Sequence, residues 1–204
     1  MPDAFAQDAA FRPAFADPVH DAQAVFRALL AAMAEPGTVH HVAPDLAPPA
    51  PLSPGAAGVA LALLDLETQL WFDGADGAGA AALGFLQFHT GVRRADAPAR
   101  ADFALVTDGL RLPPLDVFRQ GTDEEPELGA TLIIQVSAIA AEAGWRLSGP
   151  GIAGERNLRI GGLRPGLAAD LAANIGRFPR GVDLVFAAGR TICALPRTTK
   201  ISEG

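Results

Sequence analysis

The chain has 204 residues, of which 50% are hydrophobic, and its formal net charge is −7. This length suits one domain with a sizeable core, and the acidic balance argues against nucleic acid and anionic membrane surfaces as partners. No apolar run approaches the roughly 20 residues of a membrane span, and the acidic N-terminal residues do not resemble a secretory signal, so a cytoplasmic location is expected.

The chain begins with a weakly patterned, alanine-rich segment at 1–16, which predicts a loosely ordered arm. A proline-rich stretch at 43–55 is too short for a domain linker and predicts a connector within one unit. We therefore expect a single α/β domain over residues 17–204.

The first helix is predicted to begin at Asp17, a suitable N-cap, with Pro18 in the first helical position. It should end at Pro36-Gly37, because the residue before proline avoids the helical region and glycine accepts a positive φ. The spacing of its apolar residues predicts one buried face, made of Ala22, Phe26, Leu29, Leu30 and Met33.

After the connector, helical segments alternate with short apolar strands. The patterns predict helices at 56–64, 78–88 and 165–175, a helical turn at 113–119, and strands at 69–72, 103–106, 131–136, 145–147, 182–186 and 191–195. This alternation predicts a layered α/β fold. The last two strands are separated only by residues 187–190 and predict a hairpin, so the sheet should be mixed.

A glycine-rich segment at 149–154 has the G-x-G-x-x-G spacing of dinucleotide-binding turns. Such turns open directly into an apolar helix whose N-terminus binds the pyrophosphate. Here the next residues, ERNLRIGG, are polar and soon interrupted by glycine, which favours a structural turn. A ligand-facing loop with Gly149, Pro150 and Gly151 stays open, because Arg156 and Arg159 could bind phosphate oxygens.

The histidines and the single cysteine give no metal site. His40 and His41 should point to opposite faces of a strand, and no carboxylate or histidine lies at ligand spacing. Cys193 lies in an apolar strand, where a buried thiol is expected. His89, at the end of a predicted helix, suits an interaction with the helix dipole, and the alternative is a polar group at a pocket rim.

Charged and hydroxyl side chains gather at predicted strand ends. Glu127 precedes a glycine and a strand, where a solvated loop is the simpler interpretation and a ligand or partner contact the alternative. Arg180 and Asp183 flank a glycine and suggest a local ion pair. Arg197, Thr198 and Thr199 suit either oxyanion recognition or an exit turn, and the sequence does not separate the two.

Six short motifs occur in order between about Asp17 and Thr199: FRALLAAMAEPG, FHTG, PELGATL, LSGPGI, FPRGVDLVF and PRTT. Together they resemble the PhnH family, whose members are subunits of the bacterial carbon–phosphorus lyase core complex of phosphonate utilisation. Each motif is modest alone, but six in register are specific.

The resemblance implies a three-layer α/β sandwich with a mixed sheet, related to the large domain of pyridoxal-phosphate-dependent transferases without the cofactor. It further implies a homodimer in isolation and assembly with subunits G, I and J. That complex replaces the adenine of ATP with a phosphonate and forms α-D-ribose 1-phosphonate 5-triphosphate. The resemblance assigns no catalytic residue, cofactor or metal to this chain. The motif positions are therefore carried over only as candidates for a ligand site or an interface.

Two other functions stay open. A free-standing pyridoxal-phosphate enzyme would need a Schiff-base lysine, and Lys200 is the only lysine, near a chain end expected to be mobile. A nucleotide- or phosphate-binding module would use the glycine loop with Arg156, Arg180 or Arg197. The small, apolar segments at 56–64 and 78–88 are expected to supply the dimer surface.

Overall fold

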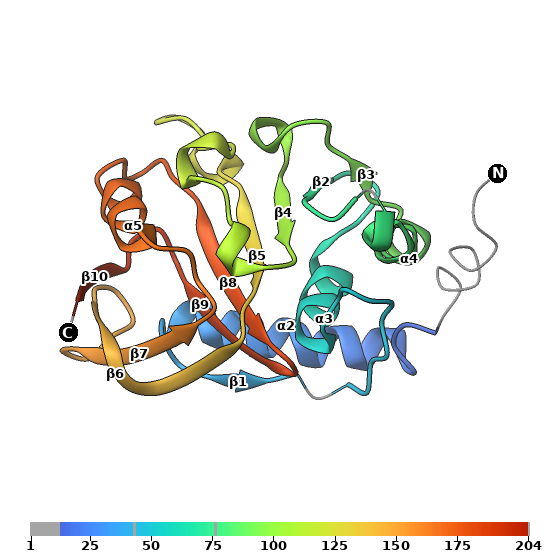
Figure 1. Ribbon diagram of the computed structural model, residues 1–204, viewed down its shortest axis with the longest axis horizontal. Helices are drawn as coiled ribbons and strands as arrows, with labels where there is room; N and C mark the ends of the chain where they lie inside the picture. The colour runs from blue at the N-terminus through green and yellow to red at the C-terminus, as the bar shows by residue number, and fades with distance from the viewer. Residues whose placement is uncertain (1–12, 43, 76, 204) are drawn as a thin grey trace.

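The computed structural model describes residues 13–42, 44–75 and 77–203, so residues 1–12 of the expected arm lie outside it. It contains a seven-stranded sheet in the order β1-β9-β8-β5-β4-β2-β3 and a three-stranded antiparallel sheet in the order β10-β6-β7 (Figure 1). The large sheet combines parallel and antiparallel neighbours, and helices pack on it, so the predicted α/β class with a mixed sheet is confirmed. No helix of the described residues is long and apolar enough to cross a membrane.

The strands are short, with the exception of the 11-residue β6 in the small sheet. Those of the large sheet span His40–His41 (β1), Gln69–Phe72 (β2), Arg93–Arg94 (β3), Phe103–Val106 (β4), Thr131–Gln135 (β5), Asp183–Ala188 (β8) and Thr191–Leu195 (β9). Those of the small sheet span Ala138–Ser148 (β6), Arg156–Gly161 (β7) and Lys200–Glu203 (β10).

Capping chemistry is clear at the start of the first helix and at the end of the third. They span Pro18–Ala34 (α2), Pro54–Leu63 (α3), Ala80–Thr90 (α4) and Leu167–Ile175 (α5), and 3-10 turns lie at Gly77–Gly79 (η1), Pro98–Arg100 (η2), Gly109–Arg111 (η3), Leu115–Val117 (η4) and Pro126–Leu128 (η5). The Asp17 side chain caps α2 by accepting from the His20 amide at 3.1 Å, as predicted. Gly91, with φ +74°, ends α4 in the left-handed conformation.

Five strands of the large sheet run parallel, in the spatial order β3-β2-β4-β5-β8. Numbered along the chain this order is 2-1-3-4-5, so the direction of winding reverses between β2 and β4. The strand β9 returns antiparallel to β8, and Phe186 pairs with Cys193. The predicted C-terminal hairpin is therefore confirmed.

Two separate cores cover the two faces of the large sheet. One packs α2, α3 and α4 against side chains such as Leu105, Ile133 and Val185. The other packs α5, η4 and strands of the small sheet against their sheet neighbours, which include Leu132 and Ile134. Figure 1 shows α4 beyond the β2–β3 end of the sheet, with the small sheet and α5 gathered at the other end.

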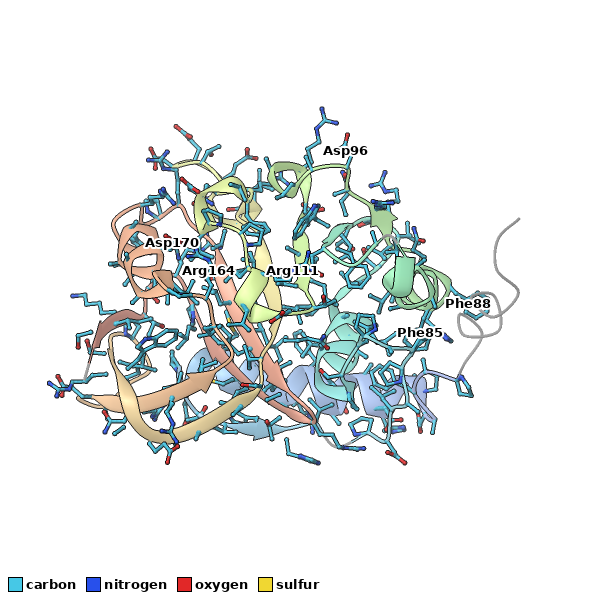
Figure 2. The ribbon with its side chains drawn as sticks, in the orientation of Figure 1. Phe85, Phe88, Asp96, Arg111, Arg164 and Asp170 are labelled. Atoms are coloured by element: carbon cyan, nitrogen blue, oxygen red, sulfur yellow. The ribbon has the colours of Figure 1, made fainter. Side chains whose placement is uncertain are left out.

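An ion pair holds α5 in place on the second face. Arg164, just before this helix in the chain, lies next to Asp170, which is a residue of α5 (Figure 2). The Asp170 carboxylate also accepts from the Leu115 amide at 3.2 Å, which joins α5 to η4. Both side chains of the pair are mostly buried, so the contact is sheltered from solvent.

The predicted buried face of the first helix is partly wrong. Leu29 is buried as predicted, but Phe26 and Leu30 are 47% and 57% exposed, and the core face is completed by Val25 and Ala32. Apolar side chains occupy two adjacent stripes of α2, and its neighbours α3 and β9 cover only one of them. Periodicity alone does not indicate which stripe faces the core.

The sequence predicted only a part of the small sheet. The strand predicted at 145–147 is the end of the 11-residue β6, and the polar segment after the glycine turn is a strand, β7. Lys200, expected in a mobile end, begins β10 and pairs with Ser148 of β6. These strands have little apolar alternation because much of β6 and β7 is exposed.

Candidate functional site

The carboxyl ends of the parallel strands form one edge of the large sheet, and a cavity of about 370 Å³ opens there. In sheets of this strand order, ligands usually bind at this edge, close to the point where the winding reverses. The polar part of the lining comes from Ser53, Thr107, Asp108, Gln135 and Ser137, and the apolar part includes Pro51, Leu52, Leu110, Val136 and Ala187. We refer to this feature as the strand-end cavity.

Gln135, the last residue of β5, organises the strand-end cavity. It is 8% exposed, and its Oε1 accepts from the Ser53 amide at 2.5 Å. Its Nε2 donates to the carbonyl oxygens of Pro51 at 2.9 Å and Thr107 at 3.1 Å. The buried amide is thus satisfied at both ends, and it fixes the start of α3 to the ends of β4 and β5.

Asp73 follows β2 at the same edge of the sheet. Both of its carboxylate oxygens lie 3.0 Å from the Thr107 amide nitrogen. Burial raises the pKa of the Asp73 carboxyl, and the hydrogen bonds from Thr107 and the positive charge of Arg111 oppose this rise only in part. The edge therefore carries a carboxyl group that ionises less readily than an exposed one.

The strand-end cavity has the chemistry of a site for hydroxyl or amine donors. Asp108 accepts from the Leu110 amide at 3.0 Å through one oxygen, and within the described residues its other oxygen and the Ser137 hydroxyl make no hydrogen bond. No lysine or arginine belongs to the described lining. A carboxylate in a lining that holds no cation disfavours a phosphate or phosphonate group at this position.

The start of α3 does not supply an anion site either, because its first amides already have partners. The Gly55 amide donates to the Gly189 carbonyl oxygen at 2.8 Å, and the Ala56 amide donates to the Ser53 hydroxyl oxygen at 3.3 Å. A helix N-terminus binds phosphate through unpaired amides. At α3 these amides are bonded within the protein and are not available to a phosphate.

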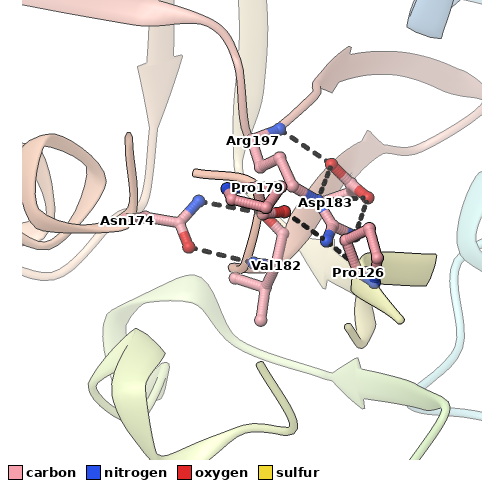
Figure 3. Close-up of polar contacts among 6 residues, drawn as sticks. All are labelled: Pro126, Asn174, Pro179, Val182, Asp183 and Arg197. Carbon is pink, nitrogen blue, oxygen red and sulfur yellow. Dashed lines mark hydrogen bonds and ion pairs between the residues drawn. The ribbon is translucent and has the colours of Figure 1, made fainter. Parts of the chain in front are cut away.

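Three of the sequence motifs meet at the opposite edge of the sheet, around Arg197 (Figure 3). The Arg197 guanidinium donates to Asp183 through Nη2 at 2.6 Å and through Nε at 3.2 Å to each carboxylate oxygen. Nη1 donates to the carbonyl oxygens of Pro126 at 2.6 Å and Pro179 at 3.4 Å. The side chains of Arg197 and Asp183 are only 11% and 17% exposed, so this cation is committed to internal contacts.

The same residues border a shallow groove of about 330 Å³, which we call the clamp groove. Its lining consists of Pro126, Glu127, Phe178, Pro179, Asp183, Pro196, Arg197 and Thr198. Of the predicted candidates, Glu127, Asp183, Arg197 and Thr198 are therefore brought together here. Arg180 and Asp183 do not pair with each other as expected: Arg180 pairs with Asp123 at 3.2 Å.

The glycine-rich loop lies against the end of α2 and joins two antiparallel strands, β6 and β7. A Cβ atom on Gly151, whose φ is +79°, would collide with the Ala34 carbonyl oxygen. Arg156 donates from Nη1 to the carbonyl oxygens of Glu35 at 3.1 Å and Pro36 at 2.7 Å. The loop lacks the following helix of a dinucleotide site, and the structural turn that the sequence favours is what it forms.

The remaining candidates lie apart from one another. His89 is in the last turn of α4, as predicted, and its ring contacts Phe85 and Phe88 edge-on with centroids 4.7 and 5.0 Å apart. It borders a different pocket, formed with Phe15 and Pro18. Thr199 is buried, and its hydroxyl has no hydrogen-bond partner among the described residues.

Neither a metal site nor a reactive thiol emerges from the described residues. No group of three His, Cys, Asp or Glu side chains in this part of the chain could hold a metal ion. Cys193 is buried in β9, and burial raises the pKa of its thiol to about 12. A thiol with that pKa is not ionised at neutral pH and is a poor nucleophile.

Comparison with known proteins adds the decisive observation. The profile of a family described as "Bacterial phosphonate metabolism protein (PhnH)" matches residues 13–202. The chain belongs to the PhnH family. Its predicted resemblance is thereby confirmed over nearly the whole length.

Two curated relatives of this chain are similar to it along most of their length. The "Alpha-D-ribose 1-methylphosphonate 5-triphosphate synthase subunit PhnH" of Rhizobium meliloti (strain 1021) is 40% identical over 201 residues, which cover 97% of this chain and 98% of the relative. The "Putative C-P lyase subunit protein HtxG" of Stutzerimonas stutzeri is 36% identical over 180 residues, which cover 88% and 85%.

The residues of the strand-end cavity were missed in the sequence. Ser53, Asp108, Gln135 and Ser137 form no motif and lie far apart along the chain. The signal that could have found some of them is positional: Asp108, Gln135 and Ser137 lie at or just after the ends of β4 and β5. Without the strand order, that position did not distinguish them from ordinary loop residues.

Proposed function

We propose that this protein is a required subunit of a carbon–phosphorus lyase core complex in phosphonate utilisation. In that complex it supports the formation of α-D-ribose 1-phosphonate 5-triphosphate from ATP and a phosphonate. The observation that carries the proposal is the 40% identity, over nearly the full length of both chains, with a subunit named for the synthase of the methylphosphonate form of this product.

In this proposal the chain turns over neither ATP nor phosphonate by itself and acts with subunits G, I and J. The strand-end cavity supports this view because its described lining has no cation for a triphosphate. Arg197 and Arg156, two of the candidate phosphate-binding cations, donate to groups of the protein itself. The remaining catalytic groups would come from the partner subunits.

Purified components test the proposal directly. Subunits G, I and J are mixed with ATP and methylphosphonate, with and without this protein, and product is followed by phosphorus NMR. We expect the ribose phosphonate triphosphate only when all four proteins are present, and no product from this protein alone. Equal product formation without it would refute the requirement.

The two alternative functions find less support in the geometry. A pyridoxal-phosphate enzyme would need its Schiff-base lysine at the cofactor, but Lys200 lies in β10 on the small sheet and is not in the lining of the strand-end cavity. A nucleotide module built on the glycine loop would need free donors, whereas Arg156 binds the end of α2. A relation to the large domain of pyridoxal-phosphate transferases therefore stays a proposal about fold ancestry, without a cofactor.

We further propose that the isolated chain is a homodimer, although not through the first of the two segments that the sequence favoured, 56–64. The small residues of α3, from Gly55 to Ala60, are buried inside the protein's own core and cannot form a surface. The exposed apolar side chains of Val19, Phe26 and Leu30 instead share one outward face of α2. A large exposed apolar patch usually marks an interface.

A further inference from the structure

The clamp groove has a rigid, electrically neutral floor. Arg197 is held by Asp183 and by carbonyl oxygens from two other segments, so its charge is compensated and its side chain cannot swing outward without losing these contacts. The backbone is also closely packed beneath it, since a Cβ atom on Gly129 would collide with the Gly181 carbonyl oxygen. The groove is therefore formed before any partner arrives.

One large apolar side chain stands at the groove with most of its surface in solvent. Phe178 is 63% exposed and lines the groove together with Pro126, Pro179 and Pro196. Proline and phenylalanine side chains offer apolar surface without losing many rotamers on binding. Such a surface is typical of the centre of a protein contact, where aromatic side chains are enriched.

One exposed turn that reaches the rim of the groove through Glu127 is acidic. Glu127 lines it, and Glu124 and Glu125 precede it in the same exposed turn. None of these three carboxylates makes a hydrogen bond or ion pair within the described part of the chain. The neighbouring Asp123 and Arg180 neutralise each other at 3.2 Å, so the rim keeps an excess of negative charge.

We propose that the clamp groove docks a segment of a partner subunit in which an apolar side chain is flanked by lysine or arginine. The apolar side chain would contact Phe178 and the prolines, and the cations would meet the unpaired carboxylates of the rim. This inference rests on the proposed function, because only a subunit of a complex has such a partner. It adds the surface through which assembly takes place.

Assembly with co-expressed subunits G, I and J tests the groove, using Phe178→Ser and Glu127→Lys. The controls are Leu66→Ser and Glu67→Lys, a matched pair of exposed residues before β2, which is separated from β8 by β4 and β5. Each groove variant should raise the apparent dissociation constant of the complex by at least about tenfold, which is the effect of losing an interface hot spot. The controls should assemble like the unchanged protein, and all four variants alone should keep its melting temperature.

The outcomes separate the two proposals. Unchanged assembly of both groove variants, while the unchanged protein assembles normally, would overturn the groove and leave the proposed function standing. Loss of the homodimer in Phe178→Ser with normal assembly would also overturn it, because the occupant would then be a second copy. Failure of the unchanged protein to assemble with the three subunits would refute the proposed function, and the groove with it.

Discussion

Arg197 shows how a charged residue in a family motif can serve the fold. Its guanidinium joins Asp183 at the start of β8 to the turn at Pro126 and the segment at Pro179. A planar cation with five donors suits this task because it reaches three chain segments at once. From the sequence, anion recognition and an exit turn were equally plausible for Arg197. The geometry gives an internal clamp.

Asp183→Ala should therefore be strongly destabilising. The substitution leaves the Arg197 cation buried without its carboxylate, which typically costs about 3 kcal/mol or more in the free energy of unfolding. Urea unfolding measures the loss. As a control, Asp96→Ala removes a carboxylate whose pair with Arg100 is exposed at both ends, and it should cost less than about 0.5 kcal/mol. Similar losses in the two variants would contradict the clamp.

Asp73 should give stability an unusual pH dependence. Because its pKa is raised in the folded protein, folding favours the protonated carboxyl, and that contribution is fully present below the unfolded pKa of about 4. It is lost as the pH rises through the folded pKa. Relative to Asp73→Asn, the free energy of unfolding of the unchanged protein should fall as pH rises above about 4. A constant difference between the two proteins across this range would exclude the effect.

At the scale of elements, helices and strands could be predicted from the sequence where a capping residue or an isolated apolar run marks them. The start of α2 at Asp17-Pro18 and the strands β2, β4 and β9 follow directly from such signals. Strands of an exposed sheet, such as β7, carry no such signal. They form by pairing with a neighbouring strand, and their own residue pattern does not mark them. The role of Gln135 in the strand-end cavity could not be predicted for a similar reason, since it depends on where α3 begins.

The packing of the glycine loop on α2 can be tested by two substitutions with the same backbone strain. Gly151 and Gly154 both have φ +79°, but a Cβ atom on Gly154 would meet nothing within 4 Å, whereas one on Gly151 would strike the Ala34 carbonyl. Gly154→Ala should cost about 1 kcal/mol from strain alone. Gly151→Ala should cost at least about 1 kcal/mol more. Equal losses in chemical unfolding would show that the loop does not depend on contact with α2.

For the whole molecule, the outward face of α2 is the surface that should hold two copies together. Phe26→Asp or Leu30→Asp places a charge on this exposed apolar face and should convert the homodimer to a monomer without lowering the melting temperature of the monomer much. Sedimentation equilibrium over a wide concentration range measures the change. A dimer of unchanged strength in both variants would place the interface elsewhere, and a monomeric unchanged protein would refute dimerisation.

The central claim is that this PhnH-family chain is required for phosphonate utilisation, and growth of a deletion strain tests it most directly. The strain is grown with methylphosphonate or with phosphate as the sole phosphorus source, with and without a plasmid copy of the gene. We predict no growth on methylphosphonate, normal growth on phosphate, and restoration by the plasmid. Normal growth of the deletion strain on methylphosphonate would contradict the claim.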